Sequence, residues 1–273
     1  ITNTIMHLNL HLPLPHRSGR NLLNVYLFEE DWQSALTEIE CHPRETRYWS
    51  SRPGFFDGRS DSKVLPLHVA FSVHAPLEVI RAIVEAYPEA LEKKESYFKR
   101  LPLHVACQFA PSADVIEYLT QEYKTGVIEP DILGRLPLHY ACANGAPLDV
   151  VKTLLQAGGA ASCLYSDYNG WIPLHVAVHH GASTEVVEEM ICVCPGAVSL
   201  RTRKRSTALS LAEKVQTKNR EEVIALLKGV SSKPNSITVL QAAQHSWELS
   251  TVVPEAEKKK EAKYMRMKRC AAA

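Results

Sequence analysis

The sequence lacks a long hydrophobic run. No stretch of its 273 residues approaches the ~20 apolar residues that a membrane-spanning helix needs. Its first residues also lack the basic segment followed by an apolar core that marks a signal peptide. Apolar residues make up 45% and charged residues 22% of the chain, which is typical of a soluble globular protein.

Motifs that carry enzyme chemistry are missing as well. There is no nucleophile elbow, zinc-protease motif or phosphate-binding glycine loop, and the 12 glycines do not form G-x-G-x-x-G. We therefore predict a protein that is not an enzyme, with no cofactor and no small-molecule substrate. An enzyme would require a catalytic domain beyond these residues.

The seven cysteines contain no C-x-x-C pair, so zinc-ribbon and thioredoxin-type sites lack their spacing. We expect reduced structural thiols in a reducing intracellular compartment, cytoplasmic or nuclear. The net charge is +1, which does not indicate a polyanion-binding protein. The segment 231–273 differs, because eight Lys and Arg stand against four Asp and Glu there.

One six-residue phrase recurs along the chain. Leu-Pro-Leu-His-Val-Ala at 65–70 and 101–106 returns as Leu-Pro-Leu-His-Tyr-Ala at 136–141 and Ile-Pro-Leu-His-Val-Ala at 172–177. A diverged fifth copy lies at 207–212, and successive copies are 36, 35, 36 and 35 residues apart. A fixed period of this size indicates a stacked-repeat protein.

The phrase resembles the T-P-L-H-x-A signature of the ankyrin repeat. The resemblance implies an all-α ankyrin-repeat solenoid, in which helix-loop-helix units stack and short β-hairpin turns join them. It also implies that the chain binds other proteins. We expect a flexible arm at 1–19, an ankyrin-repeat domain at 20–229, and a linker with a basic helical tail at 230–273. Within the domain we expect a divergent capping repeat at 20–60, ending in a long loop from 43, and five repeats at 61–228.

Two features depart from the family. Its period is about 33 residues, whereas this chain uses 35 to 36. The threonine that opens the family phrase and caps its helix is replaced by Leu65, Leu101, Leu136 and Ile172. We hypothesise that apolar contact between repeats replaces the lost cap.

The four histidines of the phrase are His68, His104, His139 and His175. Equivalent residues of stacked helices lie about 8–10 Å apart, whereas zinc requires each nitrogen at about 2.0–2.1 Å. The histidines therefore form a ladder that cannot share one ion, and we predict no metal site. The resemblance implies that they hydrogen-bond to backbone between repeats.

The resemblance places the partner on the hairpin tips and on the exposed side of the first helices. Aromatic residues and arginine dominate binding hot spots, so we select Trp171, Tyr140, Phe98 and Arg135 as anchors. The remaining candidates are Asn144, Asp167, Asn169, Gln108, Phe109, His179 and His180. The alternative is that some of these side chains pack between repeats.

The tail offers a second hypothesis. Cys270-Ala-Ala-Ala can be a farnesylation signal, and the basic residues before it favour an anionic membrane. We therefore predict a protein-binding scaffold, adaptor or structural subunit, with a membrane-tethered regulator as the alternative. A solvated helix or a segment that docks on a partner would also explain the tail. Nucleic acid is disfavoured, because only Tyr264 interrupts the tail's cations with an aromatic ring.

Overall fold

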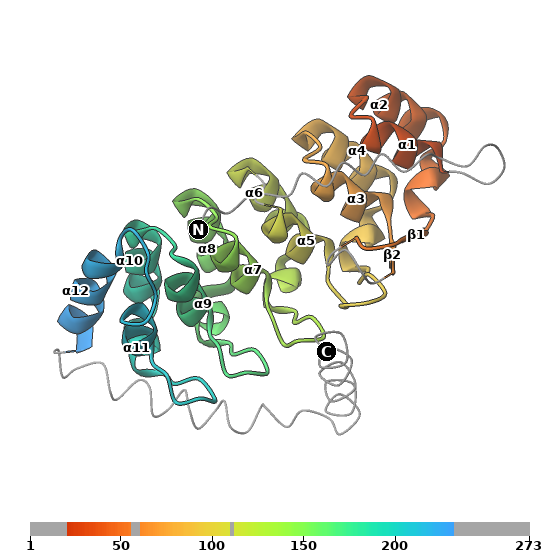
Figure 1. The fold of residues 1–273 in the computed structure, drawn as a ribbon. Helices are drawn as coiled ribbons and strands as arrows, with labels where there is room; N and C mark the ends of the chain where they lie inside the picture. The colour runs from red at the N-terminus through yellow and green to blue at the C-terminus, as the bar shows by residue number, and fades with distance from the viewer. Residues whose placement is uncertain (1–20, 56–60, 110–111, 232–273) are drawn as a thin grey trace.

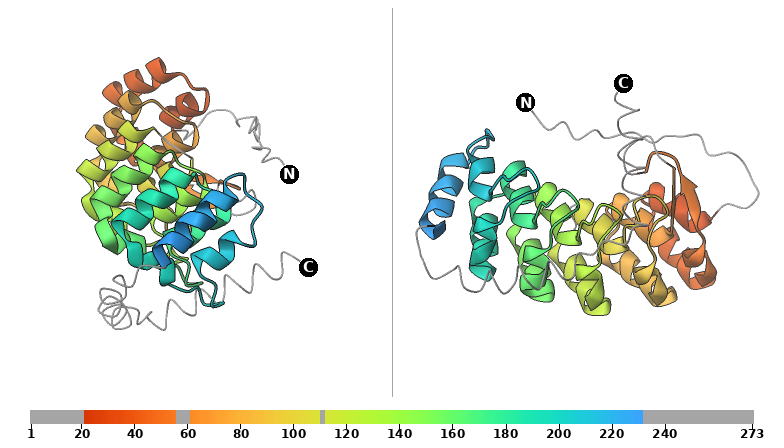
Figure 2. Two further views of the ribbon diagram at one scale, coloured as in Figure 1. Left: turned by 90° about the vertical axis from the view of Figure 1, so that its left-hand side faces the viewer. Right: turned by 90° about the horizontal axis from the view of Figure 1, so that it is seen from below.

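The computed structural model describes residues 21–55, 61–109 and 112–231. Twelve helices in this part of the chain form six antiparallel pairs that stack in chain order (Figures 1 and 2). The first helices of the pairs are α1 Leu22–Phe28, α3 Pro66–Ser72, α5 Pro102–Gln108, α7 Pro137–Ala143, α9 Pro173–His180 and α11 Ala208–Ala212. The second helices are α2 Trp32–Cys41, α4 Leu77–Ala86, α6 Ala113–Glu122, α8 Leu148–Leu164, α10 Thr184–Val193 and α12 Arg220–Ser231. The all-α repeat solenoid expected from the sequence is confirmed.

Four of the first helices begin at the Pro of the repeated phrase, where the missing N–H costs no hydrogen bond. Two residues later, the His side chain turns back and its Nδ1 accepts the N–H of the residue before Pro. The four distances are His68 to Leu65 3.2 Å, His104 to Leu101 3.1 Å, His139 to Leu136 3.0 Å and His175 to Ile172 3.2 Å. The repeated phrase therefore contains both the Pro that begins the helix and the His that accepts the N–H before it.

The residues that replace the family threonine are buried, with exposed fractions of 0–2% for Leu65, Leu101, Leu136 and Ile172. This agrees with the hypothesis that apolar contact stands in for the cap. The last repeat keeps a threonine side-chain cap, because Thr207 Oγ1 accepts the Ser210 N–H at 3.2 Å. Ser210 Oγ in turn accepts the Thr207 N–H at 2.9 Å.

The second helices bury one face each through apolar residues four positions apart, such as Val79 with Ile83 and Val150 with Leu154. First helices pack on neighbouring first helices, and second helices on neighbouring second helices. One hydrophobic core therefore runs along the described stack.

The connections between repeats form a row of hairpins at the side of the first helices. They span residues 95–100, 131–135, 167–171 and 202–206. One backbone hydrogen bond ties each hairpin to the segment before it: Ser96 N to Lys63 O at 3.2 Å, Ile132 N to Phe98 O at 2.8 Å, Tyr168 N to Leu133 O at 3.1 Å and Arg203 N to Asn169 O at 3.0 Å. The hairpins are therefore positioned relative to one another.

The tip of each hairpin requires a left-handed residue. Gly134 and Gly170 supply it with φ of 74° and 75°, and Lys99 and Arg205 adopt φ of 59° in the other two hairpins. The hairpin at 95–100 also lacks the usual Asp. Glu95 replaces it, because its carboxylate accepts the Tyr97 and Arg100 N–H groups at 2.6 and 3.1 Å.

The structure corrects two expectations and adds short elements that the sequence did not predict. Residues 43–61 are not a continuous loop, because a 3-10 helix spans η1 Pro43–Arg47 and strand β1 Ser50–Arg52 pairs antiparallel with β2 Ser62–Val64. Helix α12 continues through Gly229 to Ser231, where we expected a linker. Further 3-10 turns follow α4, α6 and α10, at η2 Pro88–Glu92, η3 Lys124–Ile128 and η4 Pro195–Ser199.

The helical conformation is interrupted inside the span of α8, where Gly159 has φ 57° and ψ −153°. No helix among the described residues is both long and apolar enough to cross a membrane. The expected arm at 1–19, and the tail from 232 onward with Cys270, lie outside the described residues.

Candidate protein-binding groove

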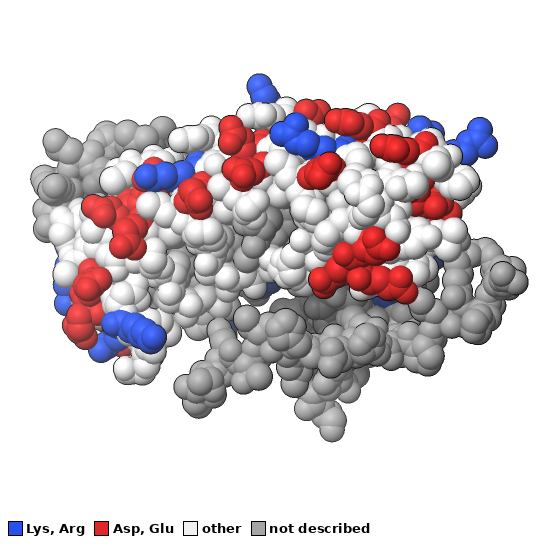
Figure 3. Space-filling view, turned by 90° about the horizontal axis from the view of Figure 1, so that it is seen from above, with Lys and Arg blue, Asp and Glu red and all other residues white. Residues whose placement is uncertain are grey.

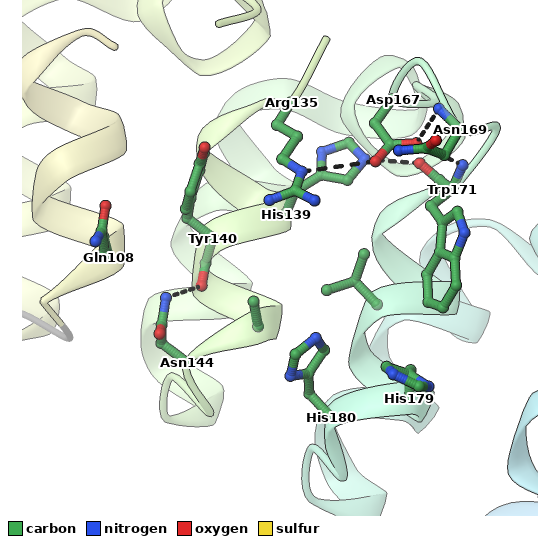
Figure 4. Close-up of a pocket in the computed structure, with 12 residues that line it drawn as sticks. Gln108, Arg135, His139, Tyr140, Asn144, Asp167, Asn169, Trp171, His179 and His180 are labelled. Carbon is green, nitrogen blue, oxygen red and sulfur yellow. Dashed lines mark hydrogen bonds and ion pairs between the residues drawn. The ribbon is translucent and has the colours of Figure 1, made fainter. Parts of the chain in front are cut away.

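A groove of about 470 Å³ opens between α7 and α9, below the hairpins 131–135 and 167–171 (Figure 4). Side chains from three consecutive repeats line it. They are Gln108, Arg135, His139, Tyr140, Ala143, Asn144, Asp167, Asn169, Trp171, Val176, His179 and His180.

The groove brings together nine of the eleven side chains proposed from the sequence. Phe98 and Phe109 do not line it. Phe109 lies at the end of α5, partly buried against the core and edge-on to His74 with ring centroids 6.4 Å apart. Three lining residues were not proposed from the sequence: Ala143, Val176 and His139.

Two of the four predicted anchors are not exposed. Phe98 and Tyr140 have exposed fractions of 4% and 5%, so the expectation that they present free aromatic surface was wrong. The reason is Arg100, whose guanidinium carbon lies 4.2 Å from the centre of the Phe98 ring and 4.6 Å from that of Tyr140. Arg100 covers both rings in cation–π contacts, so neither ring presents a free face to a partner.

The Tyr140 hydroxyl completes a buried polar network. It donates to Asp131 Oδ2 at 2.6 Å and accepts from Arg100 Nε at 3.0 Å. Arg100 Nη1 donates to Gln108 Oε1 at 2.6 Å on the wall of the groove. Burial raises the pKa of the Asp131 carboxyl, against the lowering by the hydrogen bond from Tyr140. This wall is held by mutual contacts rather than left open for a ligand.

Asp131 and Asp167 are turn residues of the hairpins. Asp131 Oδ1 accepts the Leu133 and Arg135 N–H groups, both at 2.8 Å. Asp167 Oδ1 does the same for Asn169 and Trp171, at 2.8 and 2.9 Å. Both aspartates are buried in these turns. Asp167 therefore affects the groove by fixing the conformation of its hairpin, and not through an exposed carboxylate.

Trp171, His179 and His180 form an aromatic shelf on the side of α9. The Trp171 and His179 rings meet edge to face with centroids 5.1 Å apart, and His179 meets His180 at 5.2 Å. Trp171 is partly buried, and the two histidines are exposed at the end of the helix. Of the four anchors, Trp171 and Arg135 therefore keep surface that a ligand can reach.

The comparisons with known proteins address the scaffold. A family model for ankyrin repeats in three copies matches residues 67–164, and a model for a single ankyrin repeat matches residues 169–202. The chain contains ankyrin repeats within residues 67–202. A search of curated proteins found none that matches this chain.

In this ankyrin stack the histidine ladder is structural. In all four histidines Nδ1 accepts a backbone N–H, so the proton sits on Nε2. In three of them Nε2 donates to a carbonyl of the following repeat. These bonds join His104 to Arg135 O at 3.0 Å, His139 to Trp171 O at 3.0 Å and His175 to Leu200 O at 3.1 Å. Among the described residues, no group of three or more His, Cys, Asp or Glu is placed to hold a metal ion.

Burial holds these imidazoles in the neutral form. It lowers the pKa of His104 to about 3 and the pKa values of His68, His139 and His175 to about 4. His104, His139 and His175 are neutral and hydrogen-bonded at both nitrogens, which makes them poor candidates for acid–base chemistry at the groove. What the groove offers a ligand is shape, one arginine, an aromatic shelf and amide side chains.

Proposed function

We propose that this ankyrin-repeat protein is a non-catalytic adaptor or structural subunit that holds a segment of another protein in the groove between α7 and α9. Ankyrin repeats are general protein–protein interaction modules, and proteins built from them are typically not enzymes. The groove adds a place on the stack where that general role can act.

The observation that carries the proposal is the gathering of ligand-capable side chains on rigid elements. Trp171 and Arg135 lie on hairpins whose turns are fixed by buried aspartates. His179 and His180 lie on helix α9. A pre-organised surface binds without first paying the entropy of ordering its own side chains.

The groove accounts for part of an interface. A standard protein–protein interface buries about 1,600 Å² in total, so a partner would also cover neighbouring hairpins and first helices. The row of hairpins, tied together by backbone hydrogen bonds, supplies such a surface beside the groove.

Affinity capture from native lysate with paired variants tests the proposal. The double variant Trp171→Ala with His179→Ala removes the shelf, and we expect about tenfold less of the main partner to be recovered. Trp49→Ala is a matched control, because Trp49 is exposed at the other end of the stack. Equal recovery by wild type and the double variant would exclude the groove as the binding site.

Two sequence-based hypotheses remain proposals. A reducing intracellular compartment suits the six described cysteines, which are free thiols. Membrane tethering through Cys270 concerns residues outside the described part of the chain. Mass spectrometry of the purified protein tests it, because a prenyl group would add its mass to the C-terminal peptide.

A further inference from the structure

The hairpin 202–206 and the residue before it carry a concentrated positive charge. Arg201, Arg203, Lys204 and Arg205 are all exposed, and no acidic residue lies between Leu200 and Ser206. We call these four side chains the basic tip. A cluster of positive charge without nearby acidic residues attracts an anionic partner.

The basic tip borders the groove. The Arg203 N–H donates to Asn169 O at 3.0 Å, and Asn169 lines the groove. On the other wall, the guanidinium of Arg135 faces the groove, with its Nε 3.6 Å from Asp167 Oδ2 (Figure 4). Cationic groups therefore stand on two sides of the aromatic shelf.

The second helices have the opposite charge. Helices α4, α6, α8 and α10 contain nine Asp and Glu against two Lys and Arg, a balance of −7. Figure 3 shows Asp and Glu side chains gathered on the face at the top of Figure 1. This separation of charge orients an anionic partner, because it is repelled from the second helices and attracted to the hairpins.

We propose that the groove takes an acidic protein segment. An apolar or aromatic side chain of the segment packs on Trp171 and on the apolar lining residues Ala143 and Val176. Flanking Asp and Glu side chains meet Arg135 on one side and the basic tip on the other. This inference rests on the proposed function and specifies the chemistry of the partner.

A protein segment fits the observations better than a nucleic acid. The lining of the groove includes the apolar Ala143 and Val176 together with the amides of Asn144, Asn169 and Gln108. Nucleic-acid binding requires cations along a continuous path of phosphates. Here the hairpins next to the basic tip, 131–135 and 167–171, contain two Asp against one Arg.

Selection from a random library of 12-residue peptides displayed on phage identifies what the full chain prefers. We expect the enriched peptides to combine several Asp or Glu with at least one aromatic or large aliphatic residue. A fluorescein-labelled copy of the most enriched peptide then gives affinities by fluorescence anisotropy, and a labelled 12-nucleotide oligothymidylate is measured beside it.

The decisive variant is Arg203→Glu with Lys204→Glu, which reverses two exposed charges of the basic tip. We expect it to weaken peptide binding about tenfold at low salt, and less at high salt where charges are screened. Arg81→Glu with Lys152→Glu is the matched control, because it changes the net charge equally on the second helices α4 and α8. Thermal melts of both variants show whether the stack remains folded.

The outcomes separate this inference from the proposed function. The enriched peptides could be neutral or basic and still lose binding to the Trp171→Ala variant. That result would support the groove as the binding site but refute the proposal that its ligand is acidic. Equal weakening by both double variants would also refute it, as would tighter binding of the oligonucleotide than of the peptide. A selection without enrichment, or peptides insensitive to Trp171→Ala, would count against both.

Discussion

Tyr140 links two repeats through one hydroxyl group. The group stands between Asp131 and Arg100, which are themselves 3.9 Å apart, and all three residues are buried. Without the hydroxyl, Asp131 Oδ2 would keep only the Arg100 Nε at 3.9 Å, in a buried environment where a missing hydrogen-bond partner is costly. The contact therefore contributes to stability even though Tyr140 lines a groove.

Tyr140→Phe tests this role. The substitution keeps the ring on Arg100 and removes the hydrogen bond to a buried carboxylate, so we expect a loss of about 1–3 kcal/mol in the free energy of unfolding. Urea denaturation measures it. Tyr118→Phe on α6, whose ring lies under Arg81 at 4.7 Å, is the control and should change stability by less. An unchanged midpoint for Tyr140→Phe would show that the network adds nothing.

The burial of Tyr140 had a signal in the sequence. Its position in the phrase is Val69, Val105 and Val176 in the other repeats, and an apolar residue at three of four copies indicates an inward side. The burial of Phe98 had no such signal, because it depends on Arg100 lying over the ring. Trp171, which follows the glycine of its turn, is partly exposed, and its role in binding stays a prediction.

At the scale of elements, the starts of α3, α5, α7 and α9 each combine three effects. Proline fixes the first turn, histidine accepts the N–H before it, and a buried Leu or Ile occupies the place of a capping threonine. A cap is worth about 1 kcal/mol, whereas truncating a buried leucine costs about 2–5 kcal/mol. Burial therefore wins over the side-chain cap at these positions.

Leu136→Thr tests that balance. The new hydroxyl can cap α7, but the variant loses most of a side chain with 0% exposure between repeats. We expect a net destabilisation of about 1–3 kcal/mol by urea denaturation. The reverse exchange, Thr207→Leu in the last repeat, should cost the cap and serves as comparison. A more stable Leu136→Thr protein would refute the hypothesis that apolar contact replaced the cap.

The helices were predictable because their pattern repeats, and the short elements were not. Strands β1 and β2 have three residues each, too few to show an alternating pattern, and they pair across ten or more residues of sequence. The 3-10 turns η1 to η4 have five residues each and are fixed by the helices on either side. Elements of this size depend on tertiary context rather than on local sequence.

At the scale of the whole molecule, the period of the phrase explains why residues of the groove lie together. Gln108, Tyr140, Asn144 and His180 are far apart in the chain, but a 35- to 36-residue step brings equivalent helices side by side. Which of these side chains would leave a cavity was not predictable, since that depends on the small Ala143 and on the buried network around Arg100.

The stack also distributes four neutral histidines along its core, which makes its stability depend on pH. His68, His104, His139 and His175 have pKa values of about 3 to 4 when folded, against about 6.5 when unfolded. Because the unfolded chain binds more protons between these values, stability is fully present above pH 6.5 and falls as the pH is lowered toward 4.

We expect the free energy of unfolding to fall by roughly 1 kcal/mol per histidine between pH 7 and pH 5.5. Urea titrations at several pH values measure the slope, and His104→Asn should reduce it by about one quarter, whatever its effect on stability at pH 7. Asp131 acts in the opposite direction, because its pKa is raised on folding, and so offsets a part of the loss. If wild type and His104→Asn gave parallel profiles, His104 would not be a neutral imidazole that must stay unprotonated for the repeats to remain stacked.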